Sequence, residues 1–320
     1  MNIQKKVRNL LLWLTVIAAF TACESSKYDS GMVRLFRKGN QSLKKQQYKQ
    51  AAYYFTEGIK KDSTFSEIYN NLGIALYHLG DYEQAIVQYN KALNVDSVLI
   101  DAYFNRSNAS FALEKYKEAL VDLNIAAKRH KDTTKVFFRR ATVHLQLKNY
   151  QEAIQDLDKV ISLDGNNADA LGSRGYLKYK VGKYQEAEQD LKKATELNNR
   201  QDLAFANLGL VKAALGDTTQ AFTNFDKALK INVVETYTLG HRAIIYAAQN
   251  QMDKSWKDIQ DALKYNEDTG WGHLARGYYY MKKGENGKAT VDFDKAEKLN
   301  KQIDQAAVYK KQATEEKKGS

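Results

Sequence analysis

Small and apolar residues return at a fixed interval of 34 along most of the chain, within segments that are otherwise polar. Residues 80–93 read GDYEQAIVQYNKAL, and similar segments begin at residues 114, 148, 182 and 216. Each segment carries a small residue, then a large apolar residue four positions later. Side chains four positions apart lie on one face of a helix. Each segment is therefore predicted to be an amphipathic helix that packs its apolar face on a neighbour.

The register holds over eight blocks without an insertion. The recurring small residue stands where two helices are expected to approach closely, and the large residue after it fills the space between them. The small residues are Ala51, Ala85, Ala119, Ala153, Ala187, Ala221, Ser255 and Ala289. The large residues are Phe55, Tyr89, Leu123, Leu157, Leu191, Phe225, Ile259 and Phe293.

A second apolar set precedes each of these segments, so each block is predicted to hold two helices joined by a tight turn. A residue with left-handed backbone conformation suits that turn. We assign it to Gly80, Gly182, Gly216, Gly284, Asn149 and Asn250. Asp and Asn tolerate the same conformation and are predicted to stop the second helix. They stand at Asp62, Asp96, Asp164, Asn198, Asn232, Asn266 and Asn300.

These blocks resemble tetratricopeptide repeats, which are helix–turn–helix units of 34 residues. The leading Leu-Gly pair of that family appears as Leu72-Gly73 and again as Leu208-Gly209. The resemblance implies an all-α superhelical solenoid, in which stacked neighbours bury the apolar faces. The eight units are expected at 32–65, 66–99, 100–133, 134–167, 168–201, 202–235, 236–269 and 270–303, with a capping helix and tail at 304–320.

The first 22 residues resemble a bacterial lipoprotein signal peptide. Three basic residues precede an apolar run of a length typical of a signal peptide and too short to span a bilayer, and small residues then lead to Cys23. The resemblance implies that Cys23 carries a lipid, that the preceding segment is removed and that the new amine is acylated. Residues 23–31 would form a short tether. The expected location is the bacterial cell envelope, on the outer membrane, facing the periplasm or the cell surface.

The residue types that would indicate catalysis are scattered. Five His residues stand at unrelated positions, no pair has the spacing of a zinc protease, and Cys23 is the single cysteine. The chain has neither a glycine-rich phosphate loop nor a nucleophile-elbow serine. We therefore expect a protein that is not an enzyme, with no catalytic residue, no cofactor and no metal site.

Partner recognition is expected on the first helix of each unit, which lines the concave surface in proteins with this repeat. The resemblance places Asn105, Lys135 and Arg139 at positions that can hold the carboxylate of a peptide, while the alternative is that they are ordinary charges and hydrogen bonds between repeats. The whole set of groove candidates is Asn70, Asn71, Phe104, Asn105, Asn108, Lys135, Phe138, Arg139, Tyr176 and Lys180.

The function predicted from these features is that of a membrane-anchored scaffold, which binds protein or peptide partners in envelope assembly, secretion or a cell-wall enzyme complex. Two alternatives remain at this point. One is an envelope stress or signalling sensor with a peptide-binding groove. The other is a cytoplasmic chaperone or nucleic-acid partner, which the formal net charge of +11 alone would favour. An exported, lipidated chain would not meet cytoplasmic nucleic acid, so we expect no nucleic-acid partner.

The lipid anchor can be tested by replacing Cys23 with Ser. Acyl chains contribute about 0.8 kcal/mol per buried CH₂ group, so losing them should release the chain from the membrane fraction. Ser25→Ala, two residues further on, is the matched control and should leave the distribution unchanged. Fractionation of cells that express each variant is the measurement. Firm membrane attachment of the Cys23→Ser chain would contradict the anchor.

Overall fold

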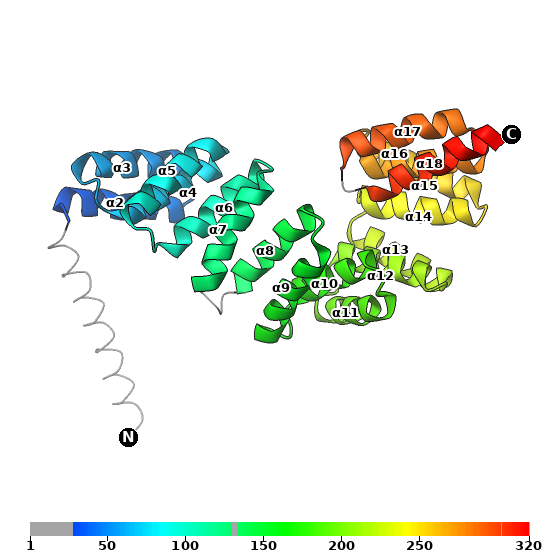
Figure 1. The fold of residues 1–320 in the computed structure, drawn as a ribbon, viewed down its shortest axis with the longest axis horizontal. Coiled ribbons are helices and arrows are strands. Elements are labelled where there is room, and N and C mark those ends of the chain that lie inside the picture. The colour runs from blue at the N-terminus through cyan, green and yellow to red at the C-terminus, as the bar shows by residue number, and fades with distance from the viewer. Residues whose placement is uncertain (1–27, 130–133, 302, 320) are drawn as a thin grey trace, which may run out of the picture. The chain divides into compact units, whose positions relative to one another are not determined.

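The computed structural model describes residues 28–129, 134–301 and 303–319, and every regular element within them is a helix. The predicted all-α class is therefore confirmed. The helices follow one another in chain order as pairs joined by tight turns (Figure 1). Cys23 and the predicted signal peptide lie outside the described residues.

Two kinds of helix alternate along the described chain. The first helix of each pair is α2 (Ser30–Lys44), α4 (Ser66–His78), α6 (Ile100–Ala112), α8 (Thr134–Gln146), α10 (Ala168–Lys180), α12 (Asp202–Ala214), α14 (Thr236–Ala248) or α16 (Gly270–Lys282). The second is α3 (Tyr48–Lys61), α5 (Tyr82–Val95), α7 (Tyr116–Arg129), α9 (Tyr150–Leu163), α11 (Tyr184–Leu197), α13 (Thr218–Ile231), α15 (Met252–Tyr265) or α17 (Asn286–Leu299). One more helix, α18 (Asp304–Gly319), ends the chain.

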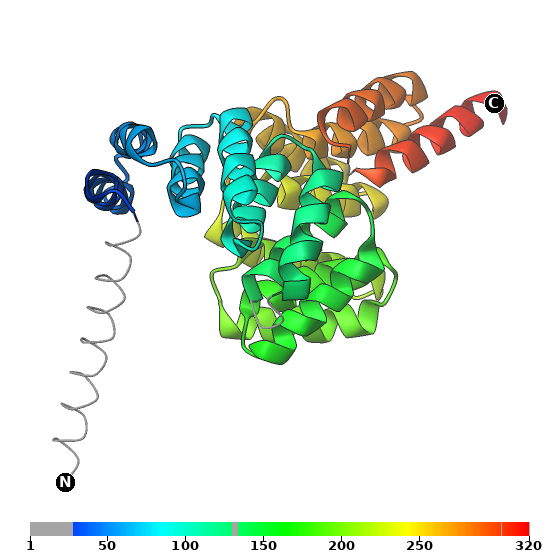
Figure 2. The same cartoon turned by 60° about the vertical axis from the view of Figure 1, so that its left-hand side comes forward.

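The chain forms two compact units, of which the first ends at Val143 and the second begins at His144. Within each unit the core lies between successive helices, as expected for stacked repeats. In the second unit α18 packs against α17, and the two helices lie side by side in Figure 2. Ala306 and Ala313 of α18 are fully buried there, so this helix covers the last apolar face of the unit.

In several pairs the close approach of the two helices depends on a residue without a side chain. A Cβ atom on Gly73 would lie 2.5 Å from the ring of Tyr89, and one on Gly209 would lie 2.7 Å from the ring of Phe225. Both distances are too short for a real contact. The large residue of the second helix therefore rests directly on the backbone of the first helix, and glycine provides the space that it needs.

Every described turn inside a pair holds its left-handed residue at the same register position. This confirms the assignment at Asn250 and at the four glycines. The assignment to Asn149 was wrong, because the left-handed residue is Lys148 (φ 59°) and Asn149 has φ −82°. The hydrogen bonds Lys148 N–Leu145 O (3.0 Å) and Asn149 N–His144 O (2.8 Å) hold this geometry. The 34-residue register thus outweighs the local preference of lysine, which disfavours this conformation by roughly 1–2 kcal/mol.

The second helices end by a different mechanism from the one predicted. Their final Asp and Asn residues have extended backbone conformations, with φ of −150° at Asp62 and −138° at Asp96, rather than left-handed ones. Each of these two carboxylates instead accepts a hydrogen bond from the backbone N–H two residues later, at 2.8 Å from Thr64 and 2.9 Å from Val98. The prediction named the right residues and the wrong reason, since the side chain stops the helix by forming a local turn.

Arginine side chains join successive second helices in both units, a feature that the sequence analysis missed. Arg174 of α10 donates two hydrogen bonds to Asp190 of α11 (2.7 and 2.6 Å) and one to Asp158 of α9 (2.7 Å). Each carboxylate is 16 residues from the arginine. We call this three-residue arrangement an arginine joint. It recurs as Asn90–Arg106–Asp122 and Asp226–Arg242–Asp258.

The close approach within a pair can be tested at Ala187, which is fully buried in α11. Its carbonyl oxygen lies 3.2 Å from where a Cβ of Gly175 in α10 would stand, so the two helices leave no room there. Ala187→Leu should destabilise the second unit by about 1–3 kcal/mol through overpacking. Gln185→Leu introduces the same side chain at an exposed position of α11 and should have little effect. Thermal unfolding followed by circular dichroism measures both, and equal small shifts would contradict the packing.

Candidate functional site

Asparagine side chains form a hydrogen-bonded row across the first helices of three successive repeats in the first unit. Asn105 of α6 donates to Asn70 of α4 (3.0 Å), and Asn70 donates to its neighbour Asn71 (3.1 Å). Asn71 then donates to Asn40 of α2 (2.8 Å). We call these four residues the asparagine row. Each amide has two donor hydrogens and an oxygen with two acceptor positions, so the row retains capacity for a ligand while its side chains are held in place.

Two cations stand one helical turn apart on α8, in the part of that helix that belongs to the first unit. The Nζ atom of Lys135 lies 5.1 Å from the ring centre of Phe104, and the guanidinium carbon of Arg139 lies 5.3 Å from the ring centre of Phe111. Such cation–π contacts position a cation without neutralising it. Among the described residues neither cation makes an ion pair, so both charges remain available to an anion.

Asn108 stands one turn after Asn105 on α6. Its Oδ1 atom is enclosed and accepts no hydrogen bond from any described residue. Phe138 is half-buried on α8 beside Arg139. The first unit thus carries eight of the ten groove residues that the sequence predicted. The asparagine row connects three of them, and the two cation–π pairs connect three more.

The other two predicted groove residues, Tyr176 and Lys180 of α10, belong to the second unit, where an acidic residue already occupies the site. Asp304, the first residue of α18, accepts hydrogen bonds from Lys180 Nζ (2.9 Å) and from Lys148 Nζ (2.5 Å). Burial alone would raise the pKa of Asp304, but the hydrogen bonds from the two lysines outweigh it and lower the pKa. Burial also raises the pKa of Tyr176 to about 12.

Sequence reasoning could not find Asp304 as a partner of these lysines. The residues are 156 and 124 positions apart, and neither pair shares a repeat position. Their contact depends on how the repeats of the second unit curve until α18 meets α10. No local pattern in the chain encodes that curvature, so the only signal was the acidic first turn of α18.

His241 of α14 is a buried histidine in an aromatic cluster of the second unit. Its ring centre lies 4.5 Å from that of Tyr237 and 4.7 Å from that of Trp271. Burial, with a smaller contribution from Lys180, lowers the pKa of His241 to about 3. The imidazole is therefore neutral at physiological pH, and it serves packing rather than acid–base chemistry.

Two further features concern residues 28–129, 134–301 and 303–319, namely groups that could bind a metal ion and helices that could cross a membrane. No group of three or more His, Cys, Asp or Glu side chains there is arranged to hold a metal ion. Within those ranges no helix is sufficiently long and apolar to cross a membrane.

Comparison of the sequence with known families identifies the repeat directly. Family models described as tetratricopeptide repeat match residues 66–97, 134–167 and 168–201. The chain therefore contains tetratricopeptide repeats, in agreement with the resemblance noted from its motifs. Comparison with curated proteins gives no significant match.

Several solved structures share the fold. YrrB, described as a TPR protein with an unusual peptide-binding site, is 26% identical with a TM-score of 0.52, and the match covers 59% of this chain and 97% of YrrB. A tetratricopeptide repeat protein from Parabacteroides merdae is 19% identical with a TM-score of 0.56, and the match covers 89% of this chain and 99% of that one. PilF of Pseudomonas aeruginosa is 18% identical with a TM-score of 0.56, and the match covers 64% of this chain and 93% of PilF. The last two support the fold alone.

The buried His241 predicts that the second unit loses stability in mild acid. The folded-state pKa of about 3 lies below the unfolded value of about 6.5, so the unfolded chain alone takes up a proton as pH falls below 6.5. The stabilisation is complete above pH 6.5, and about 2 kcal/mol of it should be lost between pH 7 and pH 5. Asp304 also has a lowered pKa, but its contribution disappears only near and below its unfolded value, outside this range.

His241→Asn should remove most of that pH dependence, because asparagine does not titrate and occupies the same repeat position at Asn207. Urea unfolding at pH 7 and pH 5, followed by tryptophan fluorescence, is the measurement. Trp256 and Trp271 both lie in the second unit and report on it. An equal loss of stability in parent and variant would show that other groups cause the acid sensitivity.

Proposed function

We propose that the chain is a membrane-anchored scaffold that binds an extended segment of a partner protein in the groove of its first unit. The observation that carries the proposal is the asparagine row, which lies next to Lys135 and Arg139 on the first helices of that unit. This surface places hydrogen-bonded amides beside two cations that make no ion pair among the described residues.

The chemistry of the asparagine row suits a peptide backbone. Each peptide unit offers one N–H donor and one C=O acceptor, and an amide side chain can pair with both. Because neighbouring asparagines hold each other by hydrogen bonds, less side-chain entropy is lost when a ligand binds.

Lys135 and Arg139 would select for a negative charge in the bound segment. Two cations one helical turn apart repel each other, and an anion between them relieves that repulsion. A carboxylate, whether from an acidic side chain or from a peptide C-terminus, fits this arrangement because the guanidinium group can bind it with two hydrogen bonds. The peptide-binding site named for YrrB, which is 26% identical to this chain, supports a peptide as the ligand.

The place of action in this proposal is the bacterial cell envelope, with the folded repeats held close to the outer membrane through lipid on Cys23. The support comes from the sequence, in which a basic start and a short apolar run lead directly to that cysteine. A scaffold in this position would bring partners together during envelope assembly, secretion or cell-wall synthesis.

The groove can be tested with Arg139→Ala. The substitution removes a cation that would donate charged hydrogen bonds, which are worth about 1.5–3 kcal/mol, so the affinity for the partner should fall roughly ten- to a hundredfold. Higher salt should weaken the parent complex more than the variant complex. The measurement is titration of the partner recovered with the lipidated chain, or of the C-terminal peptide of that partner, at two salt concentrations.

Lys117→Ala is the matched control, since it removes one positive charge from an exposed position of α7, the second helix of the neighbouring repeat. It should leave the affinity unchanged. If Arg139→Ala and Lys117→Ala bind alike, with the fold intact by circular dichroism, then Lys135 and Arg139 do not form the site.

A further inference from the structure

One joint of the second unit differs from the others at all three of its positions. The fifth and sixth repeats meet where an arginine joint is expected, but the chain has Lys192, Leu208 and Asn224 there. We call these three residues the substituted joint. The joints on either side of it have Asp158, Arg174 and Asp190, and Asp226, Arg242 and Asp258. The three substitutions belong together, because a carboxylate that loses its arginine would remain buried without a partner.

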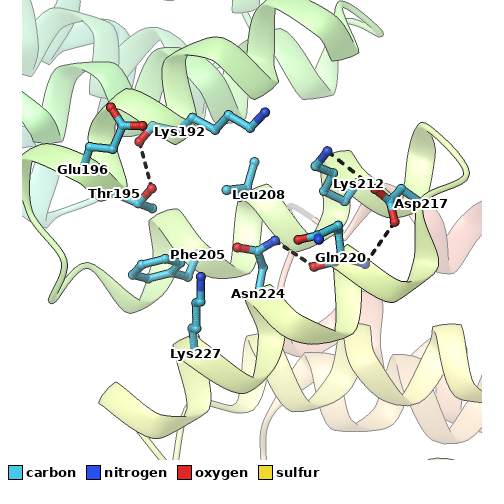
Figure 3. Close-up of a pocket in the computed structure, with 10 residues that line it drawn as sticks. All are labelled: Lys192, Thr195, Glu196, Phe205, Leu208, Lys212, Asp217, Gln220, Asn224 and Lys227. Atoms are coloured by element: carbon cyan, nitrogen blue, oxygen red, sulfur yellow. Dashed lines mark hydrogen bonds and ion pairs between the residues drawn. The ribbon is translucent and has the colours of Figure 1, made fainter.

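Without the arginine, the space between α11 and α13 stays open. A hollow of about 570 Å³ lies there, with Phe205 and Leu208 of α12 at its base (Figure 3). Asn224, which replaces the buried aspartate, turns to the backbone of its own helix and donates to the carbonyl oxygen of Gln220 (2.7 Å). The volume is within the range of ligand sites, which is roughly 300–1,000 Å³.

The charge around the hollow has also changed sign. Each flanking arginine joint carries a net charge of −1, whereas the substituted joint carries +1. Lys192 extends across the opening toward Lys212 in Figure 3. The Nζ atoms of these two lysines share the single carboxylate of Glu188, at 2.6 and 2.9 Å. Lys212 has a second carboxylate in Asp217, whereas Lys192 has only its share of Glu188 among the described residues.

Lys227 adds a third cation on the opposite side of the hollow. Its Nζ atom lies 5.5 Å from the ring centre of Phe205, and within the described part of the chain it makes no ion pair. Two other carboxylates face the hollow. Asp217 accepts from the backbone N–H of Gln220 (3.0 Å) and lies 3.7 Å from Lys212, and Glu196 is exposed at the rim beside Thr195. Because Asp217 already pairs with Lys212, an incoming acid is expected to bind Lys227 or Lys192 rather than Lys212.

We propose that this hollow is a second binding site, for a segment of a protein partner in which an acidic side chain stands next to an apolar one. The apolar side chain would cover Phe205 and Leu208, and the carboxylate would pair with Lys227 or with Lys192. The site lies between second helices, whereas the proposed groove lies on first helices of the other unit. The two sites can therefore be tested separately.

The experiment restores the missing joint. The triple variant Lys192→Asp, Leu208→Arg and Asn224→Asp introduces the residues of the flanking joints, so it should fold and close the hollow with an arginine. A fluorescent peptide of alternating Glu and Leu is titrated against the full chain and against this variant. Binding to the parent is expected, and binding to the variant should be at least about tenfold weaker, because both the cavity and a cation are lost.

A second variant and a direct readout keep the outcome clear. Lys227→Glu reverses an exposed charge without touching the core and should also weaken the peptide about tenfold. Carbodiimide coupling of the bound peptide, followed by mass spectrometry, should join its carboxylates to Lys227 and Lys192. Arg139→Ala, in the groove of the first unit, should leave this binding unchanged.

Four results would overturn the site. The first is no binding of the Glu-Leu peptide to the parent. The second is equal binding to the parent and to a triple variant that is folded by circular dichroism. The third is coupling spread over lysines elsewhere in the chain. A peptide of alternating Lys and Leu that binds as tightly as the acidic one would show adhesion through the apolar residues alone, which also excludes the proposal.

Discussion

The structure depends on one contact, in which a large side chain of the second helix rests on the bare backbone of the first. At Gly73 a single methyl group would stand 2.5 Å from Tyr89, and the same relation recurs at Gly209 with Phe225. The contact fixes both the distance and the rotation of the two helices. The same register position holds Gly39, Gly175 and Gly277, and elsewhere the small residues Ser107, Ala141 and Ala243, so each position of a repeat keeps the same local surroundings along the chain. Surface chemistry can then vary freely while the direction of each side chain stays constant.

This constraint explains which features could be predicted from the sequence. Helix pairs, buried faces and turn positions follow from spacing alone. The choice of Asn70, Asn71 and Asn105 as groove residues came instead from the resemblance to tetratricopeptide repeats. The wrong turn assignment at Asn149 arose from trusting residue type, where the register instead placed Lys148 in the left-handed conformation. The bond from Asn71 to Asn40 was missed because it links different positions of adjacent repeats. Asp304 was missed because its contacts depend on accumulated curvature, which no short pattern records.

The arginine joints recur at the same positions of several repeats, and one position of the array lacks them. A guanidinium group held by two carboxylates is costly to bury, and it is tolerated because each of its three nitrogens donates to a carboxylate. Arg174 and Arg242 meet that condition with partners 16 residues away on both sides. At the substituted joint this cost does not arise, because the arginine and both carboxylates are replaced together. A binding site in a repeat array therefore does not require an additional motif. Loss of a repeated motif from one repeat can also open a site.

Neighbouring residues on one helix can serve opposite surfaces, because successive side chains are separated by about 100° around the axis. Asn207 accepts a hydrogen bond from Tyr237 of the next first helix (2.7 Å), while Leu208 forms the base of the hollow between second helices. The next residue, Gly209, packs directly against the ring of Phe225. Three consecutive residues thus face the next repeat, the space between second helices and the partner helix. A substitution at Asn207 can alter the contact with the next repeat without changing the hollow, and a substitution at Leu208 can alter the hollow without changing that contact. Both depend on the contact of Gly209 with Phe225, which holds α12 against α13.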